Sequence, residues 1–142
     1  MSQKMRVLFL CTGNSCRSQM AEGFARALRS PEIEPWSAGI MKHGMNPRAV
    51  KAMAEAGVDI SGQTSKTVDE LPVKEFDFVV TLCDHAKEHC PILPGAGRIM
   101  HAQFDDPPSL AAGASSEEEV MGHYRRVRDE IKAFVMNFPP AG

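Results

Sequence analysis

The N-terminal part of the chain carries a cysteine and an arginine at a spacing suited to binding and attacking an oxyanion. Residues 11–18 read Cys-Thr-Gly-Asn-Ser-Cys-Arg-Ser and follow an apolar run at residues 7–10. A tight loop between a strand and a helix turns successive backbone N–H groups into one concavity, at the positive end of the helix dipole. Such a concavity binds tetrahedral oxyanions. Residues 11–18 are therefore called the oxyanion loop.

The side chains of the oxyanion loop have distinct expected roles. Cys11 is the expected nucleophile, with a thiol pKa lowered by the positive field of the loop. Arg17 can hold two anion oxygens through its planar guanidinium, and Ser18 can cap the helix or donate a hydrogen bond to the Cys11 sulfur. The remaining oxyanion-binding positions, which act with Arg17, are Thr12, Gly13, Asn14, Ser15 and Cys16.

The backbone of this loop has to turn sharply, and two of its residues suit the turn. Gly13 permits backbone angles that are closed to other residues, and Asn14 is the side chain next most tolerant of them. The Cys16 side chain is expected to be structural. In the alternative interpretation Cys11 is a small buried residue at a strand end. The strand before the motif and the helix after it favour the anion site.

Composition indicates a globular protein and limits its partners. The 142 residues, of which 43% are hydrophobic and 24% charged, are expected to form a single domain, residues 1–142. A net charge of −2 gives no reason to expect nucleic acid or an anionic membrane as a partner. The apolar run near the N-terminus is too short for a signal-peptide core or a membrane span, so we expect a cytoplasmic protein.

Four cysteines occur, at positions 11, 16, 83 and 90. In a cytosolic chain of this size they indicate chemistry rather than a disulfide framework. Their C-x4-C and C-x6-C spacings differ from the C-x2-C pairs of common zinc modules, so we expect neither a metal nor another cofactor. His85 and His89, close to Cys90, are expected to lie on an exposed helix face rather than to bind a metal.

Strand and helix patterns alternate along the chain. Short apolar runs predict strands, and amphipathic runs with capping residues predict helices. The predicted strands cover residues 4–10, 35–40, 76–82 and 97–103. The predicted helices cover residues 18–29, 46–57 and 84–90, with a last helix that starts at Ser116, and a rigid loop is predicted at residues 104–108. In the first of these helices, Met20, Phe24 and Leu28 fall on one apolar stripe.

This alternation predicts an α/β fold with a parallel four-stranded sheet flanked by helices. Ligands bind such sheets beyond the carboxyl ends of the strands. Cys11, residues 37–39, Cys83 and residues 105–106 all fall at those ends. The oxyanion loop and the other polar positions are therefore expected to meet at one edge of the sheet.

These motifs resemble those of the low-molecular-weight protein tyrosine phosphatase fold and, within it, the thioredoxin-coupled arsenate reductases. The matching runs are CTGNSCRSQMAEG, SAGI followed by HG and NP, VVTLC, CPILP and FDDP, and the similarity extends over nearly the whole chain. The resemblance implies a three-layer fold with strand order 2-1-3-4. It also implies an enzyme that detoxifies arsenic by reducing arsenate to arsenite, with thioredoxin as its partner. We expect a monomer.

The resemblance implies a relay of three cysteines. Cys11 attacks arsenate while Arg17 holds the oxyanion and Asp106 protonates the leaving oxygen. Cys83 then attacks the Cys11 sulfur and arsenite departs. Cys90 in turn attacks Cys83, which leaves a disulfide for thioredoxin to reduce.

The spacing of the last two cysteines sets a physical condition on this relay. In a helix, the offset between Cys83 and Cys90 corresponds to a rise of about 10.5 Å. A disulfide needs its two Cα atoms within about 7 Å of each other. Residues 83–94 are therefore expected to unwind or loop when these cysteines pair, as a redox-switched segment.

One departure from the resembled reductases concerns a cation. Some of them bind potassium behind the oxyanion loop, through residues matching Asn14, Glu22, Ser37 and Thr64 plus an aspartate. Lys66 stands at the position of that aspartate. Its ammonium group can therefore replace the ion.

Two other functions stay open. The first is a low-molecular-weight protein tyrosine phosphatase that hydrolyses phosphate monoesters. Those enzymes usually carry Asp-Pro-Tyr, whereas Pro108 follows Asp106-Pro107 here. Weak activity on small aryl phosphates is expected in either case, because the oxyanion loop is shared. The second is a redox sensor or anion-binding module, for which an arginine and a general acid are more than sensing needs. Two neighbouring aspartates, Asp105 and Asp106, could act as the general acid. The proline after Asp106 favours Asp106 for this role.

Overall fold

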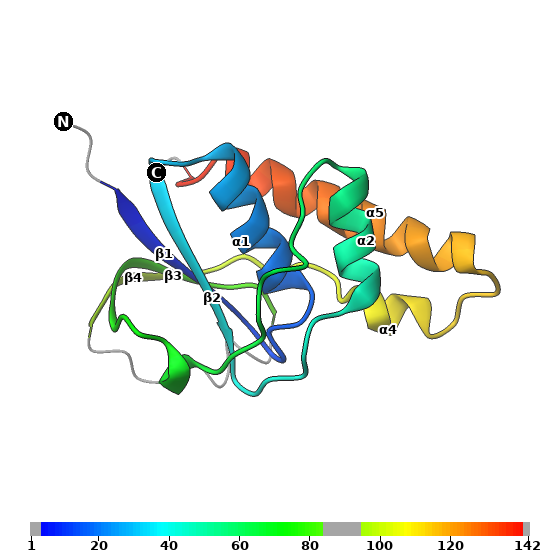
Figure 1. The fold of residues 1–142 in the computed structure, drawn as a ribbon, viewed down its shortest axis with the longest axis horizontal. Coiled ribbons are helices and arrows are strands. Elements are labelled where there is room, and N and C mark those ends of the chain that lie inside the picture. Colours follow the sequence, from blue (N-terminus) through cyan, green and yellow to red (C-terminus); the bar gives the residue numbers. More distant parts are fainter. Residues whose placement is uncertain (1–3, 84–94, 141–142) are drawn as a thin grey trace.

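Four parallel strands form one sheet in the computed structural model, which describes residues 4–83 and 95–140 (Figure 1). The strand order is β2-β1-β3-β4, with β1 paired to both β2 and β3 and β4 at an edge. This confirms the predicted fold and strand order. The strands are β1 (Met5–Cys11), β2 (Ile33–Gly39), β3 (Glu75–Thr81) and β4 (Gly95–His101).

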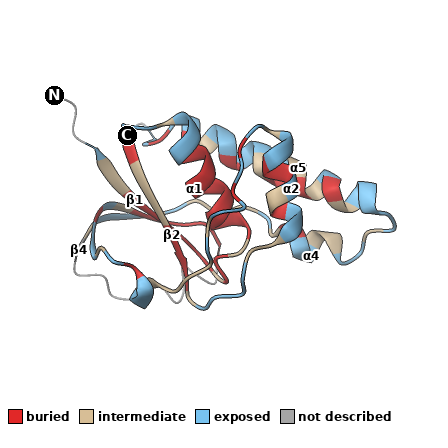
Figure 2. Cartoon of the chain, viewed as in Figure 1, coloured by how far each residue is buried: buried red, intermediate tan, exposed pale blue. Residues whose placement is uncertain are grey.

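Three helices cover one face of the sheet (Figure 1). They are α1 (Arg17–Leu28), α2 (Pro47–Glu55) and α5 (Glu117–Met136). A shorter helix, α4 (Pro107–Ala111), packs against α5. Buried residues of these helices and of the sheet form the larger core of the protein, and Figure 2 colours the buried residues red.

The central strand β1 is buried on both faces, as expected for a strand inside a parallel sheet. Its side chains alternate between two cores because successive residues of a strand point to opposite faces. Val7 and Phe9 belong to the core under the helices, whereas Leu8 and Leu10 belong to a smaller core on the other face. In the described part of the chain, the segment with the 3-10 turn η1 (Val68–Glu70) covers that smaller core.

Capping residues define the helix ends much as their sequence predicts. The Asn46 side chain caps α2 by accepting hydrogen bonds from the backbone N–H groups of Arg48 and Ala49. After that helix Gly57 adopts a left-handed φ of 84°, which is a common way to end a helix. The Ser116 side chain accepts from the Glu119 N–H at the start of α5. These contacts confirm the predicted starts of two helices.

Two local predictions are wrong. Residues 104–108 are not a loop throughout, since α4 begins at Pro107 with Asp106 at its N-cap position. Proline is favoured at the first position of a helix because its φ is already helical and its missing N–H costs no bond there. In α1, Leu28 is exposed, although the 3.6-residue spacing placed it on the buried stripe with Met20 and Phe24.

The predicted helix at residues 84–90 lies outside the described residues. Within residues 4–83 and 95–140, no helix combines the length and the apolar character needed to cross a membrane.

Candidate functional site

The oxyanion loop joins the carboxyl end of β1 to the first turn of α1. Residues 40–46 run beside it and tie down its backbone. The N–H groups of Ile40, Met41, His43 and Asn46 donate to the carbonyls of Cys11, Thr12, Gly13 and Ser15, over distances of 3.0–3.2 Å. The loop is thus held in shape by the segment that follows β2, without using its own N–H groups for these bonds.

The last residue of β2 touches the oxyanion loop at very short range. A Cβ atom added to Gly39 would lie 2.3 Å from the Met41 carbonyl oxygen and 2.8 Å from backbone atoms of Thr12 and Asn14. No side chain fits between these backbone segments. The glycine at this strand end therefore allows the close approach to the loop.

The sharp turn of the loop is made by Asn14 rather than Gly13. Asn14 has a left-handed φ of 49°, whereas Gly13 does not adopt a positive φ. Gly13 is needed for space instead, since a Cβ there would lie 2.3 Å from the His43 Nδ1 atom. The prediction that Gly13 provides unusual backbone angles is wrong, and the imidazole packed on it explains why a glycine is present.

Asn14 also holds the loop from behind. Its Nδ2 donates to Ser18 Oγ at 2.8 Å, and its Oδ1 accepts from Gln19 Nε2 at 3.0 Å and from the Lys66 N–H at 2.8 Å. Asn14 is fully buried. Ser18 therefore does not cap α1, whose N-cap residue is Cys16 without a side-chain bond, and this part of the prediction is wrong.

A cavity of about 240 Å³ lies against the oxyanion loop. It brings together three of the predicted catalytic residues, Cys11 and Arg17 from the oxyanion loop and Asp106 from the segment before α4. Two residues that the sequence analysis gave no role, His43 and Pro108, also line it. The described residues that line it are Cys11, Thr12, Gly13, Ser15, Cys16, Arg17, His43, Asp106 and Pro108.

Arg17 is buried and is positioned by the segment before α4. One guanidinium nitrogen donates to the Phe104 carbonyl at 2.9 Å, and another lies 3.4 Å from Asp106 Oδ1. Its Nε atom is buried and has no hydrogen-bond partner among the described residues. Buried N–H groups almost always have a partner in native proteins, so a guanidinium left in this state suits the binding of an anion.

The two neighbouring aspartates have different surroundings. Asp106 lines the cavity, contacts Arg17, and accepts a hydrogen bond of 2.7 Å from the Ser109 hydroxyl. Asp105 is exposed and pairs with Arg126 at 2.9 Å on the outer surface. Of the two, Asp106 is therefore the one placed to exchange a proton with a group bound at Cys11.

Cys83 lies beside Cys11 although 72 positions separate them in the sequence. The two thiols share a hydrogen bond, and Cys83 Sγ lies 3.1 Å from the Thr12 hydroxyl oxygen. Parallel pairing of β1 with β3 brings the ends of these strands together. Cys11, Cys16 and Cys83 are all in the reduced thiol state.

The pKa of the Cys11 thiol is raised well above its ordinary value, which corrects the expected lowering. The hydrogen bond with Cys83 is the largest cause, followed by burial, which disfavours a thiolate. The Arg17 charge and the Thr12 N–H lower the pKa but do not outweigh these effects. The expected lowering of the Cys11 pKa takes only the positive field of the loop into account and leaves out the effect of the second thiol.

Cys16 lines the cavity but is a poor nucleophile. The pKa of its thiol is raised to about 12, chiefly by burial and then by the nearby Asp106 charge, whereas the Arg17 charge acts in the opposite direction. Its expected structural role therefore fits its surroundings. Cys90 and the redox-switched segment at residues 83–94 lie outside the described residues apart from Cys83. Among residues 4–83 and 95–140, no group of three or more His, Cys, Asp or Glu side chains could hold a metal ion.

Behind the oxyanion loop, the buried Glu22 carboxylate contacts the Ser37 hydroxyl and the Arg26 guanidinium. Lys66 Nζ lies 4.0 Å from Glu22 and donates to the Thr64 carbonyl at 2.8 Å. Burial lowers the pKa of Lys66, while the Glu22 charge acts in the opposite direction. These residues do not fit a potassium ion, because an ammonium group already lies among the oxygen atoms that would bind it.

This arrangement predicts how potassium affects stability. Exchanging sodium for potassium is expected to leave the melting temperature of the wild type unchanged. The Lys66→Asp variant is expected to melt a few degrees higher in potassium than in sodium, because the variant replaces the ammonium group by a further oxygen ligand for the ion. Thermal unfolding in KCl and NaCl at equal ionic strength measures both. Lys42→Asp, on the exposed surface, controls for the charge change. Stabilisation of the wild type by potassium would contradict this account.

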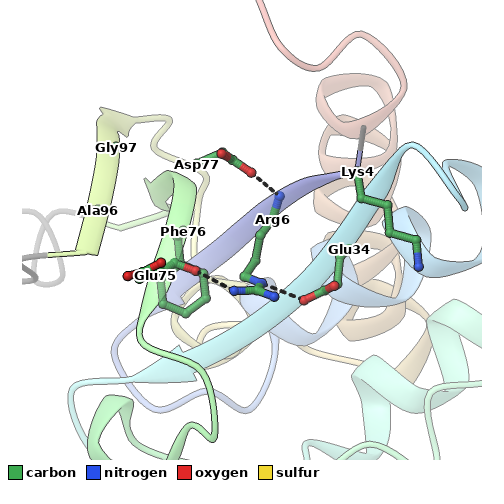
Figure 3. A pocket seen from close by; sticks show the side chains of 8 residues that line it. All are labelled: Lys4, Arg6, Glu34, Glu75, Phe76, Asp77, Ala96 and Gly97. Carbon is green, nitrogen blue, oxygen red and sulfur yellow. Dashed lines mark hydrogen bonds and ion pairs between the residues drawn. The ribbon is translucent and has the colours of Figure 1, made fainter. Parts of the chain in front are cut away.

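A larger hollow of about 550 Å³ lies at the opposite, amino end of the strands (Figure 3). The arginine that lines it is already engaged with its neighbours. Arg6 bonds Glu34 and the Glu75 carbonyl through its guanidinium, and its backbone N–H donates to Asp77. No thiol lines it. The smaller cavity at the oxyanion loop is therefore the candidate active site.

Comparison with known proteins finds relatives that match nearly the whole chain. The family described as low molecular weight phosphotyrosine protein phosphatase matches residues 6–139. An arsenate reductase of Halalkalibacterium halodurans is 49% identical over 98% of this chain and 98% of its own length. One of Bacillus subtilis is 48% identical over 96% of each. A solved arsenate reductase in the phosphate-binding state superposes with a TM-score of 0.74, at 35% identity over 95% of each chain.

Proposed function

The chain belongs to the low molecular weight phosphotyrosine protein phosphatase family, and from that premise we propose that it is an arsenate reductase. Its relatives at almost half identity over nearly their whole length are arsenate reductases. Arsenate has the shape and charge of phosphate, so an oxyanion loop of this family suits it. The reaction proposed is the two-electron reduction of arsenate to arsenite.

The observation that carries this proposal is the Cys83 thiol hydrogen-bonded to the Cys11 thiol. Hydrolysis of a phosphate ester needs one nucleophilic cysteine, an arginine and an acid. Reduction needs two electrons in addition, and two adjacent thiols supply them when they form a disulfide. A second thiol against the nucleophile therefore favours reduction.

In the first step, the Cys11 sulfur attacks arsenic and an As–S bond forms. One arsenate oxygen leaves as water with a proton from Asp106, and the Cys11 proton replaces the one that Asp106 gave. Arg17 neutralises the negative charge on the remaining oxygens. Because the pKa of Cys11 is raised, its proton has to leave as the oxyanion arrives.

In the second step, the Cys83 thiolate attacks the Cys11 sulfur. The As–S bond breaks and its electron pair stays on arsenic, so As(V) becomes As(III) and leaves as arsenite. A Cys11–Cys83 disulfide remains. The contact between the two thiols in the resting protein means that this step needs little movement of Cys83.

The third step involves Cys90, which lies outside the described residues. Its thiolate attacks the Cys83 sulfur, which releases Cys11 and leaves a Cys83–Cys90 disulfide. The dithiol of thioredoxin then reduces that disulfide by exchange. Reduced cysteines of this kind persist in the cytoplasm, which is the compartment we propose, and the protein is proposed to act as a monomer.

A single-turnover experiment tests the proposed reduction without any assumption about the partner. Reduced protein is mixed with excess arsenate in the absence of other thiols, and arsenite and remaining thiols are counted after denaturation. One arsenite per chain and two thiols lost per arsenite are expected from the electron balance. An unchanged thiol count with no arsenite would overturn the proposal. Steady-state turnover with thioredoxin, compared with glutaredoxin, then identifies the reductant.

The phosphatase remains the second candidate, favoured by the family description itself. Weak hydrolysis of small aryl phosphates is proposed as a side activity, because Cys11, Arg17 and Asp106 line one cavity. Brisk ester hydrolysis together with no loss of thiols on arsenate would give the assignment to the phosphatase.

A further inference from the structure

Beside the candidate active site lies another hollow, of about 600 Å³, which is called the larger hollow from here on. It is distinct from the hollow at the amino end of the strands. Three residues line both this hollow and the 240 Å³ cavity at Cys11, namely Ser15, His43 and Pro108. The two spaces therefore adjoin, and these three residues lie between them. Neither Cys11 nor Arg17 lines the larger hollow.

The larger hollow has walls suited to an organic group. Met45 and the ring of Tyr124 line it, together with Asn46 and Arg48. Tyr124 is almost completely buried, and its hydroxyl accepts a hydrogen bond of 3.0 Å from Asn46 Nδ2. Its lining thus combines apolar surface with a few fixed polar groups, as ligand pockets commonly do.

The His43 side chain is fixed against the oxyanion loop. Its backbone N–H donates to the Gly13 carbonyl at 3.0 Å, and its ring lies where a Gly13 Cβ atom would be. The next residue, Gly44, has a left-handed φ of 81°, so the chain turns away directly after the imidazole. His43 lines both spaces, so its side chain stands at the border between them, and the residue is exposed.

We propose that His43 is a specificity-determining residue that confines the active site to bare tetrahedral oxyanions. With Pro108 it separates the cavity at Cys11 from the larger hollow. Arsenate needs room only for its four oxygens around the central atom, whereas a phosphate monoester also needs room for its carbon group. The inference rests on the proposed function, because confinement matters for an enzyme whose substrate has no organic part.

Shortening this side chain tests the proposal. His43→Ala is expected to join the two spaces and to raise kcat/KM for p-nitrophenyl phosphate by about 10-fold, as expected when a pocket gains room for a group it excluded. The arsenite yield of a single turnover is expected to stay at the wild-type value. His43→Phe keeps a ring of similar size without polar atoms, and it is expected to retain the wild-type selectivity.

A matched control lies next to His43 in the same segment. Lys42 lines neither space and pairs with Glu70 on the surface, so Lys42→Ala is expected to leave both activities unchanged. Equal ester hydrolysis by His43→Ala and the wild type would overturn the role of His43. So would an equal gain in His43→Phe, because the ring would then not act through its size.

These outcomes are distinct from a failure of the proposed function. That failure would show in the wild type alone, as the absence of arsenite in a single turnover. The ratio of the ester hydrolysis rates of His43→Ala and the wild type measures the effect of the His43 side chain on the cavity, whether or not the wild type reduces arsenate.

Discussion

Cys83→Ser is expected to abolish arsenate reduction and to leave p-nitrophenyl phosphate hydrolysis in place. The serine hydroxyl cannot form a disulfide, so the As–S bond formed by Cys11 has no thiol to break it. Ester hydrolysis needs only the groups that line the cavity, and Cys83 is not among them. Parallel assays of arsenite release and p-nitrophenol release measure the two activities in one preparation.

The same variant is expected to make Cys11 more reactive at neutral pH. The hydrogen bond with Cys83 is the largest cause that raises the pKa of Cys11, and a serine cannot carry the competing negative charge. The pKa of Cys11 therefore falls in the variant, and a larger fraction is thiolate at pH 7. Alkylation of Cys11 by iodoacetamide, followed by mass spectrometry against pH, is expected to reach half its maximal rate at a lower pH than in the wild type.

Either of two results would contradict this account of Cys83. Arsenite production that continues over many turnovers in Cys83→Ser would show that another group resolves the first intermediate. Alkylation profiles that coincide in the two proteins would show that the contact between the thiols does not control the pKa of Cys11.

Arg17→Lys is expected to lower kcat/KM for arsenate by about 100-fold to 1000-fold, the cost typical of removing a fixed donor to a developing negative charge. The guanidinium is held by the Phe104 carbonyl and Asp106, and Arg17 lines the cavity together with Cys11. A lysine ammonium is a single point charge and cannot keep these contacts and bind two oxygens as well. Ester hydrolysis is expected to fall by a similar factor, since both reactions use the oxyanion loop.

Arg126→Lys is the matched control, because Arg126 is exposed and pairs with Asp105 and Glu130 away from the cavity. It is expected to keep wild-type activity. A loss of only about threefold in Arg17→Lys would mean that backbone N–H groups bind the oxyanion with little help from the guanidinium.

Much of the fold could be predicted because its signals are local. The apolar run that forms β1, the capping contact of Asn46 and the glycine that ends α2 depend on residues within a few positions of one another. The position of the oxyanion loop follows from the same local pattern, because a loop that leaves a parallel strand must lie at its carboxyl end. The start of α4 at Pro107 has a local signal too, because proline is favoured at the first position of a helix. The prediction of a loop at residues 104–108 leaves this signal out.

The properties that escaped prediction depend on residues distant in sequence. The raised pKa of Cys11 comes from Cys83, which only the pairing of β1 with β3 brings near. The role of Gly13 becomes clear only when His43 is seen packed on it. Hydrophobic spacing puts Leu28 on one stripe with Met20 and Phe24, but nothing in that pattern tells where along α1 the burial ends, and residues 26–28 are exposed.

The contact between Cys11 and Cys83 has a consequence for the stability of the catalytic intermediate. A disulfide between them would join the ends of β1 and β3 and close a covalent ring of about 70 residues. In the chain-entropy description, a ring of that size reduces the conformational entropy of the unfolded chain. This stabilises the folded state by about 4 kcal/mol at room temperature. The half-oxidised enzyme would then resist unfolding better than the resting enzyme. Turnover by Cys90 and thioredoxin would return the protein to its less cross-linked and less heat-resistant form.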